Sequence, residues 1–416
     1  MSKWPKYRIK DVCSVTSSTR IRSSEYQDDG VPFYRGKEII EKQRGALKVS
    51  TDIYIPRERF EEVKRKGGAP KLGELLLTSV GTLGVPYVVR KGEEFYFKDG
   101  NLTWFRAFQG LHGKYLYYWL LSPLGKAELK KCVIGSSQPA YTIVLLKEME
   151  IDCPPLQIQH QITEILSAYD DLIENNTRRI EILEEMARRL YEEWFVQFRF
   201  PGHEGVELKE SELGLIPDGW KVLALETAVE INPKTKVERD GEKVFVPMGA
   251  LSETGMVISG WEIKSGNSGA KFQNGDTLVA RISPCLENGK TGFVDFLPAT
   301  QPTACGSTEF IVLRSRSLCP EMVYCLSRSD RFREVAMKSM SGATGRQRVR
   351  VESLVGYPIA QPESELVAKY HAFAQPCFKE IRVLANKNAN LRQQRDLLLP
   401  KLISGEIDVS DIPMPT

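Results

Sequence analysis

Two long segments of the chain carry apolar residues at helical spacing. From Gln157 to Phe200 there is neither Gly nor Pro, and apolar residues alternate at intervals of four and three, as in a coiled-coil seam. The segment Ser364–Ile403 repeats the pattern. A helix of about 40 residues is ~60 Å long at ~1.5 Å per residue, so each apolar stripe needs a long partner. We therefore predict that the two helices pair with each other. The seam residues are Ile162, Leu166, Tyr169, Ile173, Ile180, Leu183, Ala187, Leu190 and Trp194 in the first segment, and Leu366, Tyr370, Phe373, Cys377, Leu384, Leu391, Leu398 and Leu402 in the second.

Prolines and asparagines interrupt this pattern. Pro376 predicts a kink or a local break in the second helix, and Pro400 predicts that the regular helix ends near Leu399. Asn176 and Asn388 stand in the seams. They are either polar residues that fix the register of the pair or exposed polar residues that the helices tolerate. The alternative to a helix pair is that each helix packs only on its own globular domain, which the length of the pattern disfavours.

The rest of the chain has the pattern of compact mixed α/β domains. Short apolar runs flanked by Gly and Pro predict strands at Glu74–Val80, Thr277–Ile282, Gly292–Phe296 and Phe310–Leu313. Apolar residues three or four apart predict helices in Lys114–Leu121 and Pro320–Met340. The predicted fold class is therefore α/β (mixed α+β), with two such domains, each followed by a long helix.

The same series of motifs occurs twice, about 200 residues apart, which indicates a tandem duplication and not an array of small repeats. The motifs Trp4-x4-Ile9, Val31–Glu38, Leu72–Leu77, Gly135–Gln138 and Pro154-Pro155 are followed in the same order by Trp220-x4-Leu225, Phe245–Leu251, Asn274–Val279, Gly342–Gln347 and Pro362. We predict a globular domain at 1–155, a helix at 156–200, a linker at 201–219, a second globular domain at 220–362, a second helix at 363–405 and a tail at 406–416.

Charge and cysteine usage narrow the class of protein. The chain has 57 basic and 54 acidic residues, a net charge of +3, so any nucleic-acid surface must be local. None of the eight cysteines forms a C-x-x-C pair and the four histidines are scattered, so no metal site is expected from spacing. Such cysteines are typical of buried, reduced thiols in a cytoplasmic protein. The N-terminus does not resemble a signal peptide, and the apolar run Tyr115–Leu121 is too short to span a membrane.

The sequence contains no recognisable catalytic motif. It has no N-P-P-Y or D-P-P-Y for amino-methyl transfer, no H-E-x-x-H and no G-x-S-x-G. Gly289-Lys290-Thr291 resembles the end of a phosphate-binding loop, but Pro284 replaces the glycine that such a loop requires. Glu93 and Glu94 near Lys98 are typical of solvated surface charge. The chain is therefore predicted not to be an enzyme by itself.

Two loops in each half combine glycine with hydrogen-bonding side chains that suit DNA. Arg and Gln make bidentate contacts to guanine and adenine edges, and cations bind phosphates. A local excess of basic residues in Asp330–Glu352 and in Arg57–Lys71 agrees with this. For Arg35 and Lys37, a solvated loop charge is an equal alternative. The candidate DNA-binding residues are Arg35, Lys37, Ser136, Ser137 and Gln138 in the first half, and Thr344, Arg346, Gln347 and Arg348 in the second.

The order of these elements resembles the specificity subunits of type I restriction-modification enzymes over essentially the full length. The residues that carry the resemblance are Pro154-Pro155-x2-Ile158-Gln159-x2-Ile162, Ser211–Trp220, Thr344–Val349 and Leu398–Ile407. The second helix entry, Gln361–Glu365, departs from the family pattern of a double proline and a glutamine, which weakens the domain boundary placed there.

The resemblance implies two target recognition domains, each of which reads one half of a split, asymmetric site in double-stranded DNA. It implies an antiparallel coiled coil that fixes the distance between the halves. It also implies docking of two methyltransferase subunits for adenine methylation and of restriction subunits, in antiviral defence. No cofactor is expected on this chain, because S-adenosylmethionine, ATP and Mg²⁺ would be bound by the partner subunits. Charged pairs such as Glu184-Glu185 and Arg188-Arg189 are candidates for that docking.

Two other functions remain to be distinguished from this one. The first is an enzyme that carries its own nuclease or methyltransferase centre, which the missing motifs disfavour. The second is a scaffold that binds only proteins and makes no contact with DNA.

Overall fold

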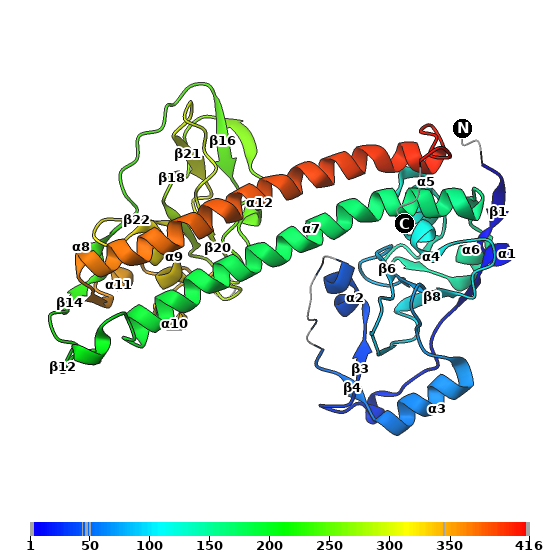
Figure 1. The fold of residues 1–416 in the computed structure, drawn as a ribbon, viewed down its shortest axis with the longest axis horizontal. Coiled ribbons are helices and arrows are strands. Elements are labelled where there is room, and N and C mark those ends of the chain that lie inside the picture. Colours follow the sequence, from blue (N-terminus) through cyan, green and yellow to red (C-terminus); the bar gives the residue numbers. More distant parts are fainter. Residues whose placement is uncertain (1–3, 44, 46–48, 50, 344–345, 413–416) are drawn as a thin grey trace. The chain divides into compact units, whose positions relative to one another are not determined.

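The computed structural model describes residues 4–43, 45, 49, 51–343 and 346–412 of the chain. The chain forms two compact units: unit 1 comprises Met1–Glu174 with Asn390–Thr416, and unit 2 comprises Asn175–Ala389. Each unit contains one globular domain together with a part of both long helices, α7 (Leu156–Tyr191) and α12 (Ser364–Ser404) (Figure 1). We call the globular parts domain 1 (residues 6–152) and domain 2 (residues 221–361).

Domain 1 is built on two small sheets and a pair of strands that join its two ends. The four-stranded antiparallel sheet has the order β2-β8-β5-β6, and the three-stranded sheet has the order β4-β3-β7, in which β3 and β7 are parallel. The strands are β1 (Lys6–Arg8), β2 (Ser14–Thr16), β3 (Val31–Tyr34), β4 (Tyr54–Ile55), β5 (Leu75–Thr78), β6 (Pro86–Val88), β7 (Tyr96–Phe97), β8 (Leu102–Arg106), β9 (Val133–Ile134), β10 (Ala140–Tyr141) and β11 (Glu150–Asp152). The helices are α1 (Ile9–Val12), α2 (Gly36–Gln43), α3 (Arg57–Gly67), α4 (Gly113–Leu121), α5 (Pro123–Lys131) and α6 (Ile143–Glu148).

Domain 2 repeats this topology strand for strand, with one strand more. The order β15-β22-β19-β20 corresponds to β2-β8-β5-β6, and β17-β16-β21 corresponds to β4-β3-β7, with β18 added at the edge. The strands are β14 (Lys221–Ala224), β15 (Val229–Ile231), β16 (Glu242–Val246), β17 (Glu262–Ser265), β18 (Ala270–Gln273), β19 (Thr277–Ala280), β20 (Thr291–Phe293), β21 (Thr303–Gly306), β22 (Phe310–Ser315) and β23 (Pro358–Gln361). The helices are α8 (Leu225–Ala228), α9 (Pro320–Arg328), α10 (Asp330–Lys338) and α11 (Glu352–Val355).

The repeated sequence motifs form the same local structures in both domains. The turn before β5 has Gly73 at φ +82°, and the turn before β19 has Gly275 at φ +90°, a conformation that glycine adopts without strain. The next residue closes each turn: the Glu74 carboxylate accepts the backbone N–H of Lys71 at 2.9 Å, and the Asp276 carboxylate accepts that of Gln273 at 2.8 Å. The duplication predicted from the sequence is therefore present in the fold.

Serine caps also recur between the paired helices of each domain. The Ser122 hydroxyl accepts the N–H of Gly125 at the start of α5, and the Ser329 hydroxyl accepts the N–H of Phe332 at the start of α10. The predicted helix Pro320–Met340 is thus two helices separated by a cap. The segment 201–219, predicted as a linker, contains a hairpin of β12 (Leu208–Ser211) and β13 (Gly214–Pro217).

The two long helices contribute to the core of each unit. In unit 1, Ile162 and Leu166 of α7 share a buried cluster with Leu402 and Ile403 of α12. In unit 2, Ala187 and Tyr191 of α7 share a buried cluster in which α12 is represented by Tyr370, Ala374, Phe378 and Ile381. The predicted seam residue Phe373 is 38% exposed because the buried stripe passes through its neighbour Ala374.

Polar contacts attach each domain to these helices. In unit 1, the Tyr118 hydroxyl donates to Asp170 at 2.6 Å and Arg90 pairs with Glu174 at 3.0 Å. In unit 2, Arg382 Nε donates to Asp295 at 2.7 Å. Burial raises the pKa of Asp295, and the Arg382 guanidinium opposes that rise. Each domain is therefore held on its helices by directional contacts as well as by apolar packing.

The helix ends differ from the prediction at both places where the sequence was ambiguous. Helix α7 was expected to reach Phe200, but its regular part ends at Tyr191; Glu192–Val196 form a wider π-helical turn, and Phe198 at φ +57° stops the helix. Helix α12 was expected to end near Leu399, but it continues through Pro400 to Ser404. The burial of Leu402 and Ile403 in unit 1 offsets the hydrogen bond that a proline removes.

Pro376 does not interrupt helix α12, which runs without a break from Ser364 to Ser404. The ring of Pro376 lies on the exposed side of the helix, and the next two residues, Cys377 and Phe378, are buried. Tertiary packing therefore overrides the helix-breaking tendency of the proline.

The seam asparagines are buried partners. Asn176 is 9% exposed and Asn388 is 2% exposed. The side-chain amide of Asn176 donates to the Asn388 carbonyl oxygen at 3.0 Å, and the Asn388 amide donates to the Thr177 hydroxyl at 3.2 Å. Of the two interpretations left open by the sequence, exposed polar residues are excluded. A buried polar pair of this kind is satisfied only when the helices keep one register.

A buried glutamine explains the proline-proline-glutamine entry of the first long helix. The Gln159 side chain accepts the backbone N–H of His112 at 2.8 Å and donates to the carbonyl oxygens of Gly110 and Pro154. It thereby ties the loop before α4 to the start of α7. In unit 2 the loop before α9 is held from the other side of the proline, because the Ser317 hydroxyl donates to the Gln361 side chain at 2.8 Å. The unusual second entry is thus a rearranged form of the first.

We predict that Asn388→Ala destabilises unit 2, because it leaves the buried Asn176 amide without its acceptor. The cost is about 1–3 kcal/mol. In calorimetry this lowers the melting temperature of that unit by about 2–4 °C per kcal/mol. Asn386→Ala, at an exposed position of the same helix, is the matched control and should leave the transition unchanged. Equal effects of the two substitutions would contradict the assignment.

We predict that unit 1 loses stability below neutral pH through His112. Burial, together with the charges of His160 and Lys114, lowers the pKa of His112 to about 4. Because the unfolded chain takes up this proton at pH ~6.5, stability falls as the pH drops from about 6.5 to about 4, by up to about 1 kcal/mol per pH unit. Urea unfolding at pH 7 and pH 5 should show a smaller loss for His112→Gln than for the wild type; an identical loss would refute the prediction.

Candidate nucleic-acid interface

The first candidate loop of domain 1 joins β3 to α2, and its arginine is already paired. The Arg35 guanidinium donates to Glu38 at 2.8 Å and to Asp52 at 2.5 Å. Glu38 is fully buried. Burial acts to raise the pKa of Glu38, but the hydrogen bonds and charge of Arg35 hold it below its usual value. Arg35 therefore compensates a buried carboxylate, and its part in DNA contact stays a prediction.

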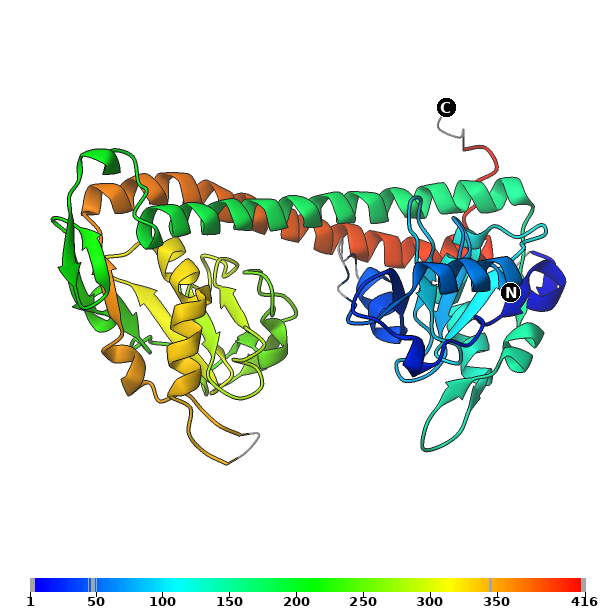
Figure 2. The same cartoon turned by 90° about the horizontal axis from the view of Figure 1, so that it is seen from below.

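The remaining candidates of domain 1 are accessible. Lys37 is 65% exposed and approaches Glu41 only at 3.9 Å. Ser136, Ser137 and Gln138 are exposed at the tip of the hairpin formed by β9 and β10. The turn depends on Gly135 at φ +81°, where a Cβ atom would lie 2.8 Å from the carbonyl oxygen of Gln138. Figure 2 shows this hairpin extending from the body of unit 1.

The candidate loop of domain 2 is also a hairpin closed by paired residues. Ser341 and Arg348 exchange backbone hydrogen bonds at 3.0 and 2.9 Å. The Arg348 guanidinium holds Glu309 with Nη2 at 2.7 Å and Nε at 2.9–3.0 Å, which lowers the pKa of the Glu309 carboxyl. Arg348 is thus anchored by a carboxylate at the base of the loop, with close to half of its side chain exposed.

The other predicted residues of this loop differ in accessibility. Arg346 is exposed, and among the residues that the structure describes its side chain has no charged partner. Gln347 is half-buried and its carbonyl oxygen accepts the N–H of Ser283 at 3.0 Å. Thr344 lies outside the described residues. Arg346 is therefore the cation of this loop best placed to bind a phosphate or a base edge.

Two further arginines lie at this loop and were not found from the sequence. Arg350 is exposed, and its Nε donates to the Ser341 hydroxyl at 3.1 Å. Arg281 lies after β19, and its carbonyl oxygen accepts the N–H of Val349 at 2.9 Å. Arg281 is far from the loop in sequence, so only the strand pairing brings it there. The basic excess of Arg350 was visible in the sequence, but the reasoning stopped at the glycine-rich string.

The basic segment Arg57–Lys71 is largely neutralised by its own acids. On α3, Arg59 pairs with Glu62 and with Glu25, and Lys66 pairs with Glu62 at 2.6 Å. Such exposed pairs contribute little stability, but they reduce the positive potential of this helix. The local excess counted along the sequence therefore overstates the charge available at this surface.

The charged stretch of α7 predicted for subunit docking is divided between two roles. Glu184 is buried in unit 2, where its carboxylate accepts the Tyr324 hydroxyl at 2.5 Å and the backbone N–H of Met256 at 3.0 Å. Burial raises its pKa. Glu184 therefore holds domain 2 and is not available to a partner.

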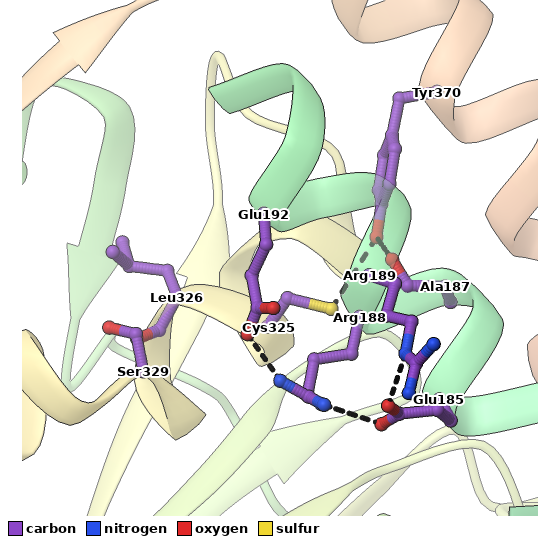
Figure 3. A network of polar contacts seen from close by, with 9 residues as sticks. All are labelled: Glu185, Ala187, Arg188, Arg189, Glu192, Cys325, Leu326, Ser329 and Tyr370. Carbon is purple, nitrogen blue, oxygen red and sulfur yellow. Dashed lines mark hydrogen bonds and ion pairs between the residues drawn. The ribbon is translucent and has the colours of Figure 1, made fainter. Parts of the chain in front are cut away.

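The other charges of this stretch form a network along α7. Arg188 and Arg189 both pair with Glu185, and Arg188 also pairs with Glu192 (Figure 3). Nearby, the Tyr370 hydroxyl donates to the carbonyl oxygen of Ala187 at 3.0 Å and lies 3.4 Å from Cys325 Sγ. This side of the helix keeps its charges at the surface.

With this geometry in place, the chain can be compared with known proteins. Residues 1–185 match the family model described as the type I restriction modification DNA specificity domain. The chain is 27% identical to the MjaIX type I restriction enzyme specificity subunit of Methanocaldococcus jannaschii, over 98% of this chain and 94% of that protein. It is 32% identical to a putative type I restriction enzyme specificity subunit of Haemophilus influenzae, over 44% of this chain and 45% of that protein.

The fold agrees with that of a solved relative. The crystal structure of the type I restriction-modification system S subunit from M. genitalium superposes with a TM-score of 0.58 at 15% identity, over 96% of each chain. The mixed α/β fold with long helices is thereby confirmed. Within the described residues, no helix combines the length and apolar character that crossing a membrane requires.

The fold and the sequence matches together define a DNA specificity component. The chain is related to the type I restriction enzyme specificity subunits, as the sequence predicted. It is not an enzyme by itself, because its relatives are named for the specificity component of a restriction enzyme.

We predict that Arg346→Ala weakens DNA binding on every sequence and lowers the salt slope of binding by about one, as expected for the loss of one phosphate contact. Glu309→Gln should strengthen binding at low salt, because it frees Arg348 from its carboxylate. Lys338→Gln, at an exposed residue that pairs with Glu334, is the control. Titrations at several salt concentrations provide the test. Unchanged affinity in the double variant Arg346→Ala/Arg348→Ala would favour a scaffold that does not contact DNA.

Proposed function

We propose that this chain is the non-catalytic specificity subunit of a type I restriction-modification complex, with domains 1 and 2 as its target recognition domains. Each domain reads one half of a bipartite, asymmetric DNA site. The observation that carries the proposal is the duplication: two domains of the same strand order and pairing, each held on parts of the same two helices. Two copies of one topology with different loops suit two half-sites of different sequence.

The two long helices are proposed to pair as an antiparallel coiled coil that sets the spacing of the half-sites. Contacts within each unit support an antiparallel direction. In unit 2, Ala187 contacts Tyr370 while Asn176 contacts Asn388, so one sequence number rises as the other falls. In unit 1, Asp170 pairs with Arg395 at 2.5 Å. Helices of this kind are stiff enough to hold a spacing of about one DNA turn, ~34 Å.

Exposed apolar residues on the helices support docking of partner subunits. In unit 2, Ile182 and Met186 of α7 and Val383 of α12 are about half exposed, and in unit 1 Leu172 and Leu397 are more than half exposed. Large apolar side chains at helical spacing on a surface indicate a protein interface. We propose that two methyltransferase subunits dock here. They would supply S-adenosylmethionine for adenine methylation, and restriction subunits would supply ATP-driven cleavage with Mg²⁺.

The strands that close each domain define clean boundaries for an exchange. Strands β1 and β11 pair Lys6 with Asp152, and β14 and β23 pair Lys221 with Gln361. Replacing a segment from the first to the second residue of either pair therefore moves a whole domain. These boundaries leave both long helices and their contacts with each other in place.

The decisive experiment exchanges Lys6–Asp152 for the corresponding domain of a relative, in a complex with its methyltransferase. Mapping methylated positions in the host genome should show one half of the target changed, with the other half and the gap unchanged. The reciprocal exchange of Lys221–Gln361 should change the other half. Unchanged specificity after both exchanges would overturn the proposal. Methylation by the isolated chain with S-adenosylmethionine would instead indicate an enzyme.

A second experiment tests the spacing role of the helices. One heptad is inserted after Glu174 in α7 and one after Ala389 in α12, at the division between the two units. Seven residues add ~10.5 Å at ~1.5 Å per residue and preserve the phase of the seam. The preferred gap between half-sites should grow by about three base pairs at ~3.4 Å each. A three-residue insertion, which breaks the phase, serves as the control. An unchanged gap with the heptads would exclude the helices as the spacer.

A further inference from the structure

Three side chains of metal-binding type meet in unit 2, where α9 contacts α12. Cys319 is the residue before α9, Glu321 lies in its first turn, and His371 lies on α12. Their sulfur, oxygen and nitrogen atoms all lie within 4.8 Å of one another. His371 Nδ1 and Glu321 Oε2 are 2.8 Å apart. The cluster combines residues about fifty positions apart in sequence, so a search for closely spaced ligands does not find it.

Burial makes this arrangement unusual for a surface cluster. Glu321 is 3% exposed and Cys319 is 8% exposed. A buried carboxylate is costly unless a charge or several hydrogen bonds compensate it. Among the described residues, the ion pair found for Glu321 is with His371, which compensates fully only when the imidazole is protonated. Burial and the charge of Glu321 raise the pKa of the Cys319 thiol.

We propose that Cys319, Glu321 and His371 form a binding site for a divalent transition-metal ion, with Zn²⁺ as the ion that fits best. One thiolate, one imidazole and one carboxylate form the mixed sulfur, nitrogen and oxygen set that Zn²⁺ accepts in tetrahedral geometry. Binding replaces the thiol proton of Cys319, which leaves to solvent, and moves the imidazole proton of His371 to Nε2. The departure from the sequence-based expectation of no metal site arises from the tertiary contact.

The site has a route for metal entry and a position for a fourth ligand. His371 is the outermost of the three residues, with 38% of its side chain exposed. The two buried ligands thus lie behind an accessible imidazole, and a water molecule can complete a four-coordinate ion from that side. Domain 1 lacks this set, since α4 has Lys114 at the position that Glu321 occupies in α9.

The consequence of metal binding is a cross-link between domain 2 and the long helix α12. Helix α9 packs against β19, β20 and β22 of domain 2. The ion would join its first turn to α12 one residue from Tyr370, whose hydroxyl already contacts Cys325 of α9. The site therefore has a structural role, in which the metal fixes the orientation of domain 2 on its helix.

The test uses the full-length chain, purified without chelator after growth with added zinc. Elemental analysis should find one zinc per chain, and titration of the metal-free protein with Co²⁺ should give a thiolate-to-cobalt charge-transfer band. Cys319→Ser should abolish the band, and His371→Gln should lower the affinity by about tenfold or more. The matched controls are Cys132→Ser, at a buried cysteine of unit 1, and His160→Gln. Both should bind metal as the wild type does.

A second readout separates loss of metal from loss of fold. Removing zinc should lower the melting temperature of unit 2 in the wild type but not in His371→Gln, whose substitution at a partly exposed position should leave the chain folded. The proposal is overturned if the wild type shows no zinc, no cobalt band and no thermal shift with either ion. It is also overturned if Cys319→Ser and His371→Gln retain wild-type affinity.

Discussion

A helix as long as α7 or α12 cannot bury its apolar stripe against one small sheet domain. A four-stranded sheet of this kind covers a few helical turns, whereas α12 extends from Ser364 to Ser404. The chain meets this constraint in two ways. Each helix contributes to the cores of both compact units, and within each unit the helices also contact each other. The duplicated domains, the buried asparagines and the polar attachments all follow from the need to cover these stripes.

The repeated architecture could be predicted because its signals are local. Glycine turns, serine caps and apolar spacing are each set by a few adjacent residues, and the turns at Gly73 and Gly275 form alike in both halves. The helix ends were less predictable because packing of Leu402 and Ile403 outweighs Pro400. The sequence alone also could not decide whether the seam asparagines were buried, since that depends on which face of each helix meets the other.

The candidate site was predicted less well because ion pairs depend on distant residues. Arg35 and Arg348 were chosen as cations, yet each is held by a carboxylate, Asp52 or Glu309, that the fold brings close. Arg281 was missed for the same reason, because strand pairing places it at the loop. The two domains also differ: domain 2 has Met248 and Gly249 where domain 1 has Arg35 and Lys37, so the two halves offer different chemistry on one topology.

The discontinuity of unit 1 has a consequence for the order of folding during synthesis. Its core includes Leu399, Leu402, Ile403 and Val409, and the Gln161 side chain donates to the carbonyl oxygen of Ile412 at 2.9 Å. These residues leave the ribosome last, whereas unit 2 is one continuous segment. Unit 2 can therefore complete its core while the end of the chain is still in the exit tunnel. The N-terminal half, although synthesised first, reaches its final state last and depends longest on protection from aggregation.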